Sequence, residues 1–203
     1  MKSQDSSPYY EHHALNSLGR SELAPDRSEL IPFLLEVKTN GRILDLGCGL
    51  GMDLELMHRS GHQAVGVEIS PKLAELARTR NAGVEILEKN FLFLSLKDSE
   101  FDGIWANRSL HHFEAEAVQR VIATAFKGLK SGGVLGVVVY EGSESFQDCG
   151  NDHLSPTRWI HPFSENALCS MIEQTGFKIL KIGKQKQVAP HPLPSMLILA
   201  RKV

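Results

Sequence analysis

Short apolar runs alternate with segments of helical periodicity through most of the chain, and this alternation limits its fold more than any other feature. The runs of strand length are residues 42–46, 63–69, 84–88, 102–106, 133–140, 177–186 and 195–203. The segments of helical periodicity that follow strands are residues 50–59, 71–79, 114–129 and 164–175. Strands that alternate with helices form a parallel sheet covered on both faces. The sequence therefore predicts an α/β, doubly wound, Rossmann-like sandwich with a seven-stranded, mostly parallel sheet.

The linker before the last strand predicts the direction of that strand. Residues 187–194 connect the two final strands and contain Pro190, Pro192 and Pro194. A parallel crossover needs about a dozen residues or more, usually in a helix, and proline breaks a helix interior. We therefore expect the strand at 195–203 to run antiparallel to the one before it.

Composition and charge argue against several classes of partner. The 203 residues include 22 basic and 24 acidic side chains, a net charge of −2, which argues against strong attraction to nucleic acid or anionic lipid. The first residues lack the apolar centre of a signal peptide, and the longest apolar run, 133–140, is too short to cross a bilayer. Three widely spaced cysteines without a CxxC pair indicate reduced thiols. We expect a cytoplasmic protein, a monomer or homodimer, without nucleic-acid or membrane partners.

A glycine-rich turn joins the first strand to the following helix. Residues 45–51 read Asp-Leu-Gly-Cys-Gly-Leu-Gly. Such a turn lets the backbone approach a ligand closely, and the free N–H groups of the helix carry partial positive charge. The dinucleotide pattern GxGxxG fails, because its third glycine would fall on Met52 or Leu54. No Gly-Lys-Ser/Thr follows, so a phosphate-binding loop is absent as well.

Two acidic residues narrow the choice of ligand. Asp45 lies two residues before the first glycine of the turn, where a carboxylate would repel a pyrophosphate and favour an ammonium group. Glu68, at the end of the second strand, can accept hydrogen bonds from ribose hydroxyls. The site thus favours a ligand with a ribose, a cationic amine and no phosphate, and S-adenosylmethionine meets these requirements.

The same motifs carry a family resemblance. Residues 41–141 resemble the core of the class I S-adenosylmethionine-dependent methyltransferases, with 43–51 similar to the first motif and 101–112 similar to the strand-four motif. Residues 161–164 and 175–177 are similar to the carboxyl-terminal part of members that act on small molecules. The resemblance implies methyl transfer from S-adenosylmethionine to a small molecule by SN2 displacement, with S-adenosylhomocysteine as product. We interpret residues 1–40 as a helical lid, with helices at 10–18 and 28–38, and residues 41–203 as the cofactor-binding domain, so that the chain is one domain overall.

The resemblance also implies roles for single residues. Those expected to bind the cofactor are Asp45, Gly47, Cys48, Gly49, Gly51, Glu68, Ile69, Asn90, Phe91, Asn107 and Ser109. Asn90 departs from the family, which usually has an acidic residue there, but its amide oxygen can still accept one hydrogen bond. His112 matches the histidine of the strand-four motif, and it could orient substrate, act as a base or bond a nearby backbone group.

Further candidates come from the lid and from a long polar loop at 141–162, which we expect to be a lid or binding segment. Both Arg158 and His161 lie in this loop; Arg158 is a candidate for substrate contact, and His161 is a candidate catalytic residue. Tyr9 and Tyr10 resemble lid aromatics, which either face the sulfonium or pack the lid on the core. Arg108 would favour an acidic acceptor if it faces the pocket; otherwise it is a solvated or salt-bridged arginine.

Some alternatives stay open. No metal site is predicted, because the spacing of His12, His13, His153 and His161 does not suit one. A protein that binds S-adenosylmethionine without catalysis, as a sensor or partner subunit, would carry the same motifs. An NAD-dependent oxidoreductase is a second rival, because NAD sites use the position of Glu68 too.

Overall fold

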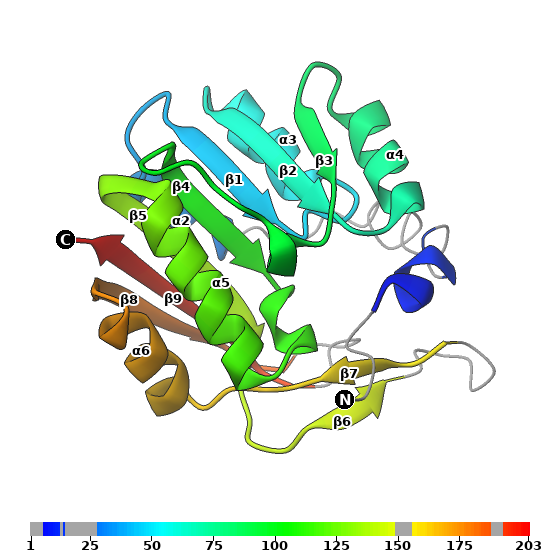
Figure 1. The fold of residues 1–203 in the computed structure, drawn as a ribbon, viewed down its shortest axis with the longest axis vertical. Helices are drawn as coiled ribbons and strands as arrows, with labels where there is room; N and C mark the ends of the chain where they lie inside the picture. Colours follow the sequence, from blue (N-terminus) through cyan, green and yellow to red (C-terminus); the bar gives the residue numbers. More distant parts are fainter. Residues whose placement is uncertain (1–5, 13, 15–27, 149–155, 188–192) are drawn as a thin grey trace.

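A seven-stranded sheet forms the centre of the protein (Figure 1), with the strand order β3-β2-β1-β4-β5-β9-β8. The computed structural model describes residues 6–12, 14, 28–148, 156–187 and 193–203. The strands of this sheet are β1 (Arg42–Leu46), β2 (Gln63–Glu68), β3 (Glu85–Glu88), β4 (Phe101–Asn107), β5 (Leu129–Tyr140), β8 (Phe177–Gln185) and β9 (Ser195–Lys202). Strands β1 to β5 pair in parallel. β9 lies antiparallel to both β5 and β8, which confirms the expected direction of the last strand.

Helices cover both faces of the sheet. On one face lie α2 (Leu30–Glu36), α3 (Met52–Arg59) and α4 (Pro71–Arg80); on the other lie α5 (Ala115–Gly128) and α6 (Glu165–Gln174). Serine caps begin two of them, because the hydroxyl groups of Ser70 and Ser164 accept backbone N–H groups in the first turns of α4 and α6. The predicted doubly wound α/β sandwich is confirmed.

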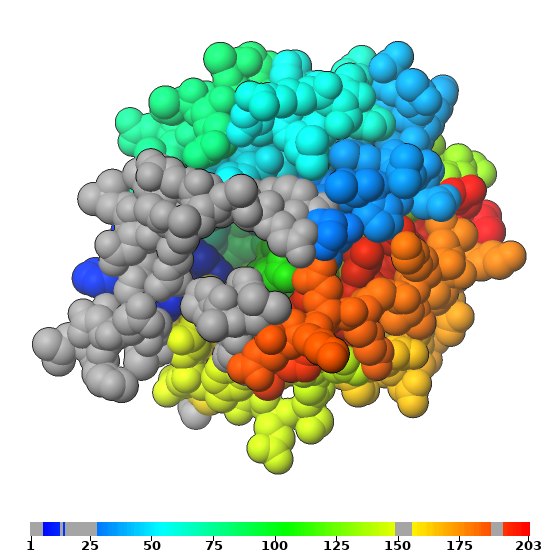
Figure 2. Space-filling view, turned by 180° about the vertical axis from the view of Figure 1, so that it is seen from behind, coloured from blue at the N-terminus to red at the C-terminus, as the bar shows by residue number. Residues whose placement is uncertain are grey.

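The hydrophobic core therefore forms two layers. Behind the sheet, the ring of Phe33 from α2 packs against Trp105 of β4, with centroids 4.9 Å apart. Figure 2 shows α2 in blue between α3 and the edge formed by β8 and β9. An ion pair links α2 to this edge, because Arg201 of β9 lies 2.6 Å from Glu36.

The predicted loop at 141–162 contains two short strands that the sequence pattern did not reveal. β6 (Phe146–Asp148) and β7 (Arg158–Ile160) pair antiparallel as a separate two-stranded sheet. Each strand has 3 residues, too few for an alternation of polar and apolar residues to show. The structure thus corrects this part of the prediction.

The two amino-terminal helices differ from their expected bounds. Residues 7–12 and 14 are helical, so the first helix begins before residue 10, and residues 13 and 15–18 lie outside the described part. The second is α2, shorter than the expected 28–38. Within the described residues, no helix combines the length and the apolar composition needed to cross a membrane.

Candidate functional site

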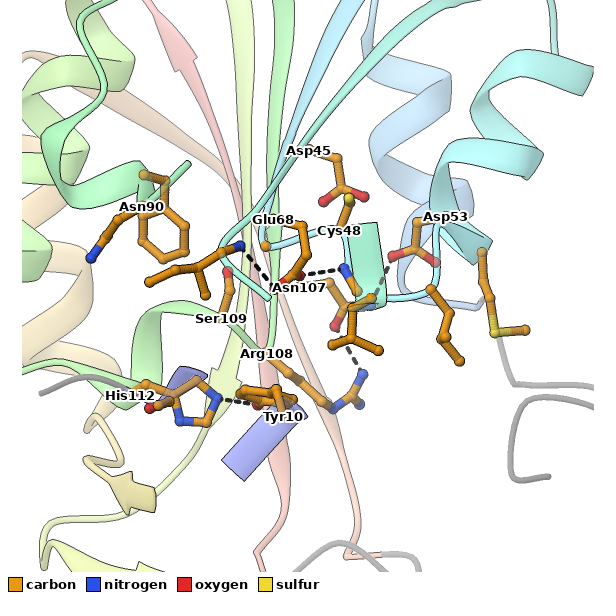
Figure 3. Close-up of a pocket in the computed structure, with 18 of the residues that line it drawn as sticks. Tyr10, Asp45, Cys48, Asp53, Glu68, Asn90, Asn107, Arg108, Ser109 and His112 are labelled. Atoms are coloured by element: carbon orange, nitrogen blue, oxygen red, sulfur yellow. Dashed lines mark hydrogen bonds between the residues drawn. The ribbon is translucent and has the colours of Figure 1, made fainter. Parts of the chain in front are cut away.

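A cavity of about 310 Å³ lies at the carboxyl ends of β1, β2 and β4, as Figure 3 shows in close-up. Parallel α/β sheets bind ligands at this edge, because the loops that leave the strands diverge there. The described residues that line the cavity are Ser6, Tyr10, Asp45, Gly47, Cys48, Gly49, Leu50, Met52, Asp53, Glu68, Ile69, Leu73, Asn90, Phe91, Asn107, Arg108, Ser109, His112 and Phe113. They include all residues predicted to bind the cofactor except Gly51.

The glycine turn forms one wall of this cavity. Gly49 has a φ of +54°, and a Cβ atom there would meet nothing within 4 Å, so its backbone borders open space. A Cβ atom on Gly47 would come within 2.6 Å of the Ser109 Cβ atom. Gly51 instead faces α4, where a Cβ atom would lie 2.3 Å from Asn81 Nδ2. We infer that Gly51 serves the packing of α3 against α4, which explains its absence from the lining.

Glu68 is buried at the end of β2 and organises the loop around it. Its Oε2 atom accepts the backbone N–H of Gly49, and its Oε1 atom accepts those of Ile69 and Ser70, each at 2.9 Å. Burial raises the pKa of this carboxyl group, although the three backbone hydrogen bonds work in the opposite direction. A carboxylate has about four acceptor positions, so Oε2 keeps one for a ligand hydroxyl.

Asp53 is a lining residue that the sequence reasoning missed. Its Oδ2 atom accepts from Trp105 Nε1 at 2.8 Å and from Asn107 Nδ2 at 2.9 Å. A signal was available, because Asp53 lies in the first turn of the helix that follows the glycine turn. The other missed lining residues in the described part are Ser6, Leu50, Met52, Leu73 and Phe113.

Asn90 and Phe91 line the side of the cavity formed after β3. The Asn90 side-chain oxygen accepts the backbone N–H of Leu92 at 2.9 Å and so caps a short turn, η1 (Phe91–Phe93). One acceptor position of that oxygen is therefore used within the chain. Phe91 packs edge-on against Phe113, with centroids 5.3 Å apart, and presents an apolar surface.

Arg108 faces the pocket and is also salt-bridged, so it meets both alternatives that the sequence left open. It lines the cavity, and its guanidinium also pairs with buried Glu29 at 2.8 Å and donates to the Asn107 side chain at 2.9 Å. Among the described lining residues it alone carries a permanent positive charge. Its φ of 53° places a bulky residue in the left-handed region, a strained backbone of the kind that clusters at functional sites.

His112 and Tyr10 meet at the opposite wall (Figure 3), where Tyr10 Oη lies 2.6 Å from His112 Nε2. The other ring nitrogen, Nδ1, lies 3.1 Å from the Trp159 carbonyl oxygen, which can only accept. Nδ1 therefore carries the proton, Nε2 accepts, and Tyr10 donates. Burial, reinforced by the charge of Arg158, lowers the pKa of His112 to about 3, so the ring is neutral.

Besides Gly51, three of the predicted site residues lie outside the lining. The Arg158 guanidinium carbon lies 4.4 Å from the Tyr9 ring centroid, and the Tyr9 ring packs edge-on against that of Tyr10. His161 Nδ1 lies 2.9 Å from the Ser145 hydroxyl oxygen, and this contact is exposed. The geometry therefore gives no support to a catalytic role for His161. His13 and His153 lie outside the described residues.

Comparison with known proteins tests one of the alternatives that the sequence left open. A family model described as a methyltransferase domain matches residues 16–182. The chain belongs to this methyltransferase family. The match confirms the resemblance described above and goes against the NAD-dependent oxidoreductase.

Relatives of this methyltransferase domain act at different atoms, as their names state. The chain is 27% identical over 186 residues to 24-methylenesterol C-methyltransferase 2 of Oryza sativa subsp. japonica, covering 84% of this chain and 51% of that protein. It is 31% identical over 132 residues to a ubiquinone biosynthesis O-methyltransferase of Xanthomonas euvesicatoria pv. vesicatoria, covering 61% and 49%. The chain thus spans about half the length of the curated relatives it matches.

Solved structures share the methyltransferase fold. An S-adenosylmethionine-dependent methyltransferase of Methanosarcina mazei superposes with a TM-score of 0.73 at 23% identity, covering 83% of this chain and 95% of that one. The 1,6-didemethyltoxoflavin-N1-methyltransferase of Burkholderia thailandensis, solved with its substrate and S-adenosylhomocysteine, gives a TM-score of 0.70 at 20% identity, covering 100% and 93%.

The residues of the methyltransferase cavity fit S-adenosylmethionine. Asp45, Asp53 and Glu68 make its lining acidic, which suits a cation and not a phosphate. The buried Ser109 hydroxyl has no hydrogen-bond partner within the described part of the chain, so it can bond a ligand. Together with the open space beside Gly49, these groups form a cradle for a cationic nucleoside.

Proposed function

We propose that this protein transfers a methyl group from S-adenosylmethionine to a small-molecule acceptor. The acidic cavity beside the glycine turn carries this proposal, because it matches a cationic nucleoside without phosphates. When bound, S-adenosylmethionine supplies an electrophilic methyl group on a positively charged sulfur. The two named relatives are a C- and an O-methyltransferase, and one similar solved structure is an N-methyltransferase. Similarity to these proteins therefore does not identify the acceptor atom.

In this proposal each wall of the cavity holds one part of the cofactor. Gly47, Cys48 and Gly49 line the methionine part, and Asp45 holds its amino group. Glu68 accepts from the ribose through the remaining position on Oε2. The adenine lies between Ile69, Asn90 and Phe91, while Asn107 and Ser109 lie beside the sulfur, at the end of β4.

The chain contributes to the reaction mainly by orientation and by excluding water. Holding two reactants in line can lower the barrier by about 7–11 kcal/mol, so a protein base is not obligatory. We assign His112 a role in orientation and not as the base, because its Nε2 atom already accepts from Tyr10. Its low pKa, about 3, also makes it a poor proton acceptor near neutral pH.

We also propose that the amino-terminal residues up to 40 act as a lid. Ser6 and Tyr10 contribute to the lining, and in Figure 1 the helix at 7–12 lies between α4 and the β6–β7 hairpin. The lid and the sheet edge together would shield the reacting atoms from water, which is a competing nucleophile.

Calorimetry and methyl transfer test this function. S-adenosylmethionine and S-adenosylhomocysteine should bind, and NAD should not. Labelled methyl transfer should then occur to at least one acceptor in a panel of alcohols, phenols, amines, thiols and activated carbon compounds. Tight cofactor binding without transfer to any acceptor would favour the non-catalytic sensor or partner subunit.

Location and assembly complete the proposal. The near-neutral charge and the free thiols of Cys48 and Cys169 support a cytoplasmic protein without nucleic-acid partners. We propose a monomer or homodimer, which light scattering coupled to size-exclusion chromatography would distinguish.

A further inference from the structure

The β6–β7 hairpin and the amino-terminal helix meet at Tyr10, although they are distant in sequence. Arg158 of β7 donates through Nη1 to the Tyr10 oxygen at 2.7 Å. Its guanidinium carbon also lies 4.4 Å from the ring centroid of Tyr9 and 5.4 Å from that of Tyr10. One side chain of the hairpin therefore contacts both tyrosines of the helix.

Arg158 is held in place by its neighbour across the hairpin. Asp148 pairs with Arg158 in the β6–β7 register, and its Oδ2 atom accepts from Nε at 2.9 Å and from Nη2 at 2.8 Å. Both side chains are largely buried, with 16% and 23% of their surface exposed. Two charge-assisted bonds to one oxygen fix the plane of the guanidinium and hence the direction of Nη1.

The hairpin also holds the other partner of Tyr10. The Trp159 carbonyl oxygen, in β7, accepts from His112 Nδ1 and thereby makes Nε2 the acceptor for the Tyr10 hydroxyl. With its hydrogen on His112 and one lone pair engaged by Arg158, the Tyr10 oxygen retains only an acceptor position. Any ligand group that meets this oxygen must therefore be a hydrogen-bond donor.

A second attachment lies on the other side of the helix. The Glu11 carboxylate accepts from the Ser70 hydroxyl, and its Oε1 atom also accepts the Lys72 backbone N–H at 3.1 Å. Figure 1 shows the helix between α4 and the β6–β7 hairpin. Glu11 thus fastens it to the start of α4, and Tyr10 fastens it to the hairpin.

We propose that Arg158 and Asp148 are positioning residues that keep the amino-terminal helix closed over the bound cofactor. Neither residue lines the cavity, so both act through Tyr10, which does. The proposal rests on the proposed function in that the occupant is S-adenosylmethionine or its product. Release of the product would then require the contact between Tyr10 and the hairpin to break.

The dissociation rate of S-adenosylhomocysteine from the full-length protein tests this idea. We expect Arg158→Met and Tyr10→Phe each to raise this rate about tenfold or more, because each removes a hydrogen bond to a charged group. If Arg158 acts through Tyr10, the double variant should release the product no faster than the faster single variant. Amide hydrogen exchange of residues 7–12 should accelerate in the same variants. Gln147→Ala, an exposed change beside Asp148, is the matched control and should leave both readouts unchanged.

An unchanged dissociation rate in Arg158→Met would overturn the proposal. A double variant whose dissociation rate rises by the product of the two single-variant increases would overturn it as well. If Arg158→Met does not fold, Asp148→Asn should accelerate dissociation and exchange in its place, and normal values in that variant would equally refute the idea. A wild-type protein that binds no S-adenosylhomocysteine would refute the proposed function instead. Hydrogen exchange of residues 7–12 in the ligand-free protein would then still decide whether the hairpin holds the helix.

Discussion

Replacing Glu68 with glutamine tests the cofactor site directly, because it removes the charge with almost no change in shape. The carboxylate accepts three backbone N–H groups at 2.9 Å, from Gly49, Ile69 and Ser70. Glutamine has one acceptor oxygen, so its NH₂ group must face at least one of these N–H groups. If the oxygen stays with Ile69 and Ser70, the bond to the glycine turn is lost, together with the acceptor position left for the ribose.

The expected loss of affinity follows from the bonds involved. A hydrogen bond to a charged group contributes about 1.5–3 kcal/mol, and about 1.4 kcal/mol corresponds to a factor of ten. Glu68→Gln should therefore weaken S-adenosylhomocysteine binding by roughly 10- to 150-fold in isothermal titration calorimetry. Glu68→Ala should weaken it at least about tenfold for the same reason.

Glu68→Gln should change the stability of the protein less than its affinity for the cofactor. Burial raises the pKa of Glu68, so the folded protein holds this proton more readily than the unfolded chain does. The stability that this group contributes is present below its ordinary pKa and is lost as the pH rises through the raised folded value. Above the raised pKa the buried charge is unfavourable, and a neutral glutamine relieves that cost, which offsets the lost bond to Gly49.

Glu88 provides a matched control for Glu68→Gln. Glu88 pairs with Glu68 in the neighbouring strand but is exposed, so Glu88→Gln should change neither the affinity nor the melting temperature. Wild-type affinity in Glu68→Gln would place the ribose elsewhere. A loss of binding that only accompanies unfolding would make Glu68 a structural residue.

Three further predictions concern stability and the shape of the site. Gly47→Ala should lower both the melting temperature and the affinity for S-adenosylhomocysteine, because its Cβ atom would lie 2.6 Å from that of Ser109. Gly49→Ala should also lower the affinity but with a smaller loss of stability, because its Cβ atom would meet nothing within 4 Å. Equal losses of stability in the two variants would contradict this. Hydrogen bonds from Lys130 and the Arg42 backbone outweigh burial and lower the pKa of Asp102, so its contribution is present above the ordinary pKa and lost as the pH falls through the folded value. Asp102→Asn should thus cost about 1.5–3 kcal/mol in urea unfolding at pH 7 and progressively less as the pH falls below the ordinary pKa of an aspartate, and a cost independent of pH would be evidence against it. The pKa of His112 is lowered from 6.5 to about 3, so the folded protein loses about 1.4 kcal/mol of stability for each pH unit as the pH falls between these values. His112→Gln should flatten that dependence, and parallel curves for the two proteins would exclude this assignment.

Local sequence features were enough to predict the fold and one wall of the site. Alternation of strands and helices specifies a covered parallel sheet, and the proline-rich linker excludes a helical crossover, so the direction of β9 followed without coordinates. The glycine turn and Glu68 were found because they are adjacent to strand ends, and the carboxyl ends of parallel strands share one edge. These are short-range patterns whose consequences do not depend on distant parts of the chain.

The other wall of the cavity depends on contacts between distant segments. Arg158, His112 and Tyr10 come together from β7, the turn after β4 and the amino-terminal helix, and no spacing in the sequence encodes that meeting. The hairpin that carries Arg158 has strands too short to show a pattern. Gly51 was predicted to belong to the binding turn, but a Cβ atom at this position would face α4, because successive residues of a tight turn direct their Cβ positions differently. Periodicity reveals which residues share a face of one element, whereas packing alone determines which elements meet.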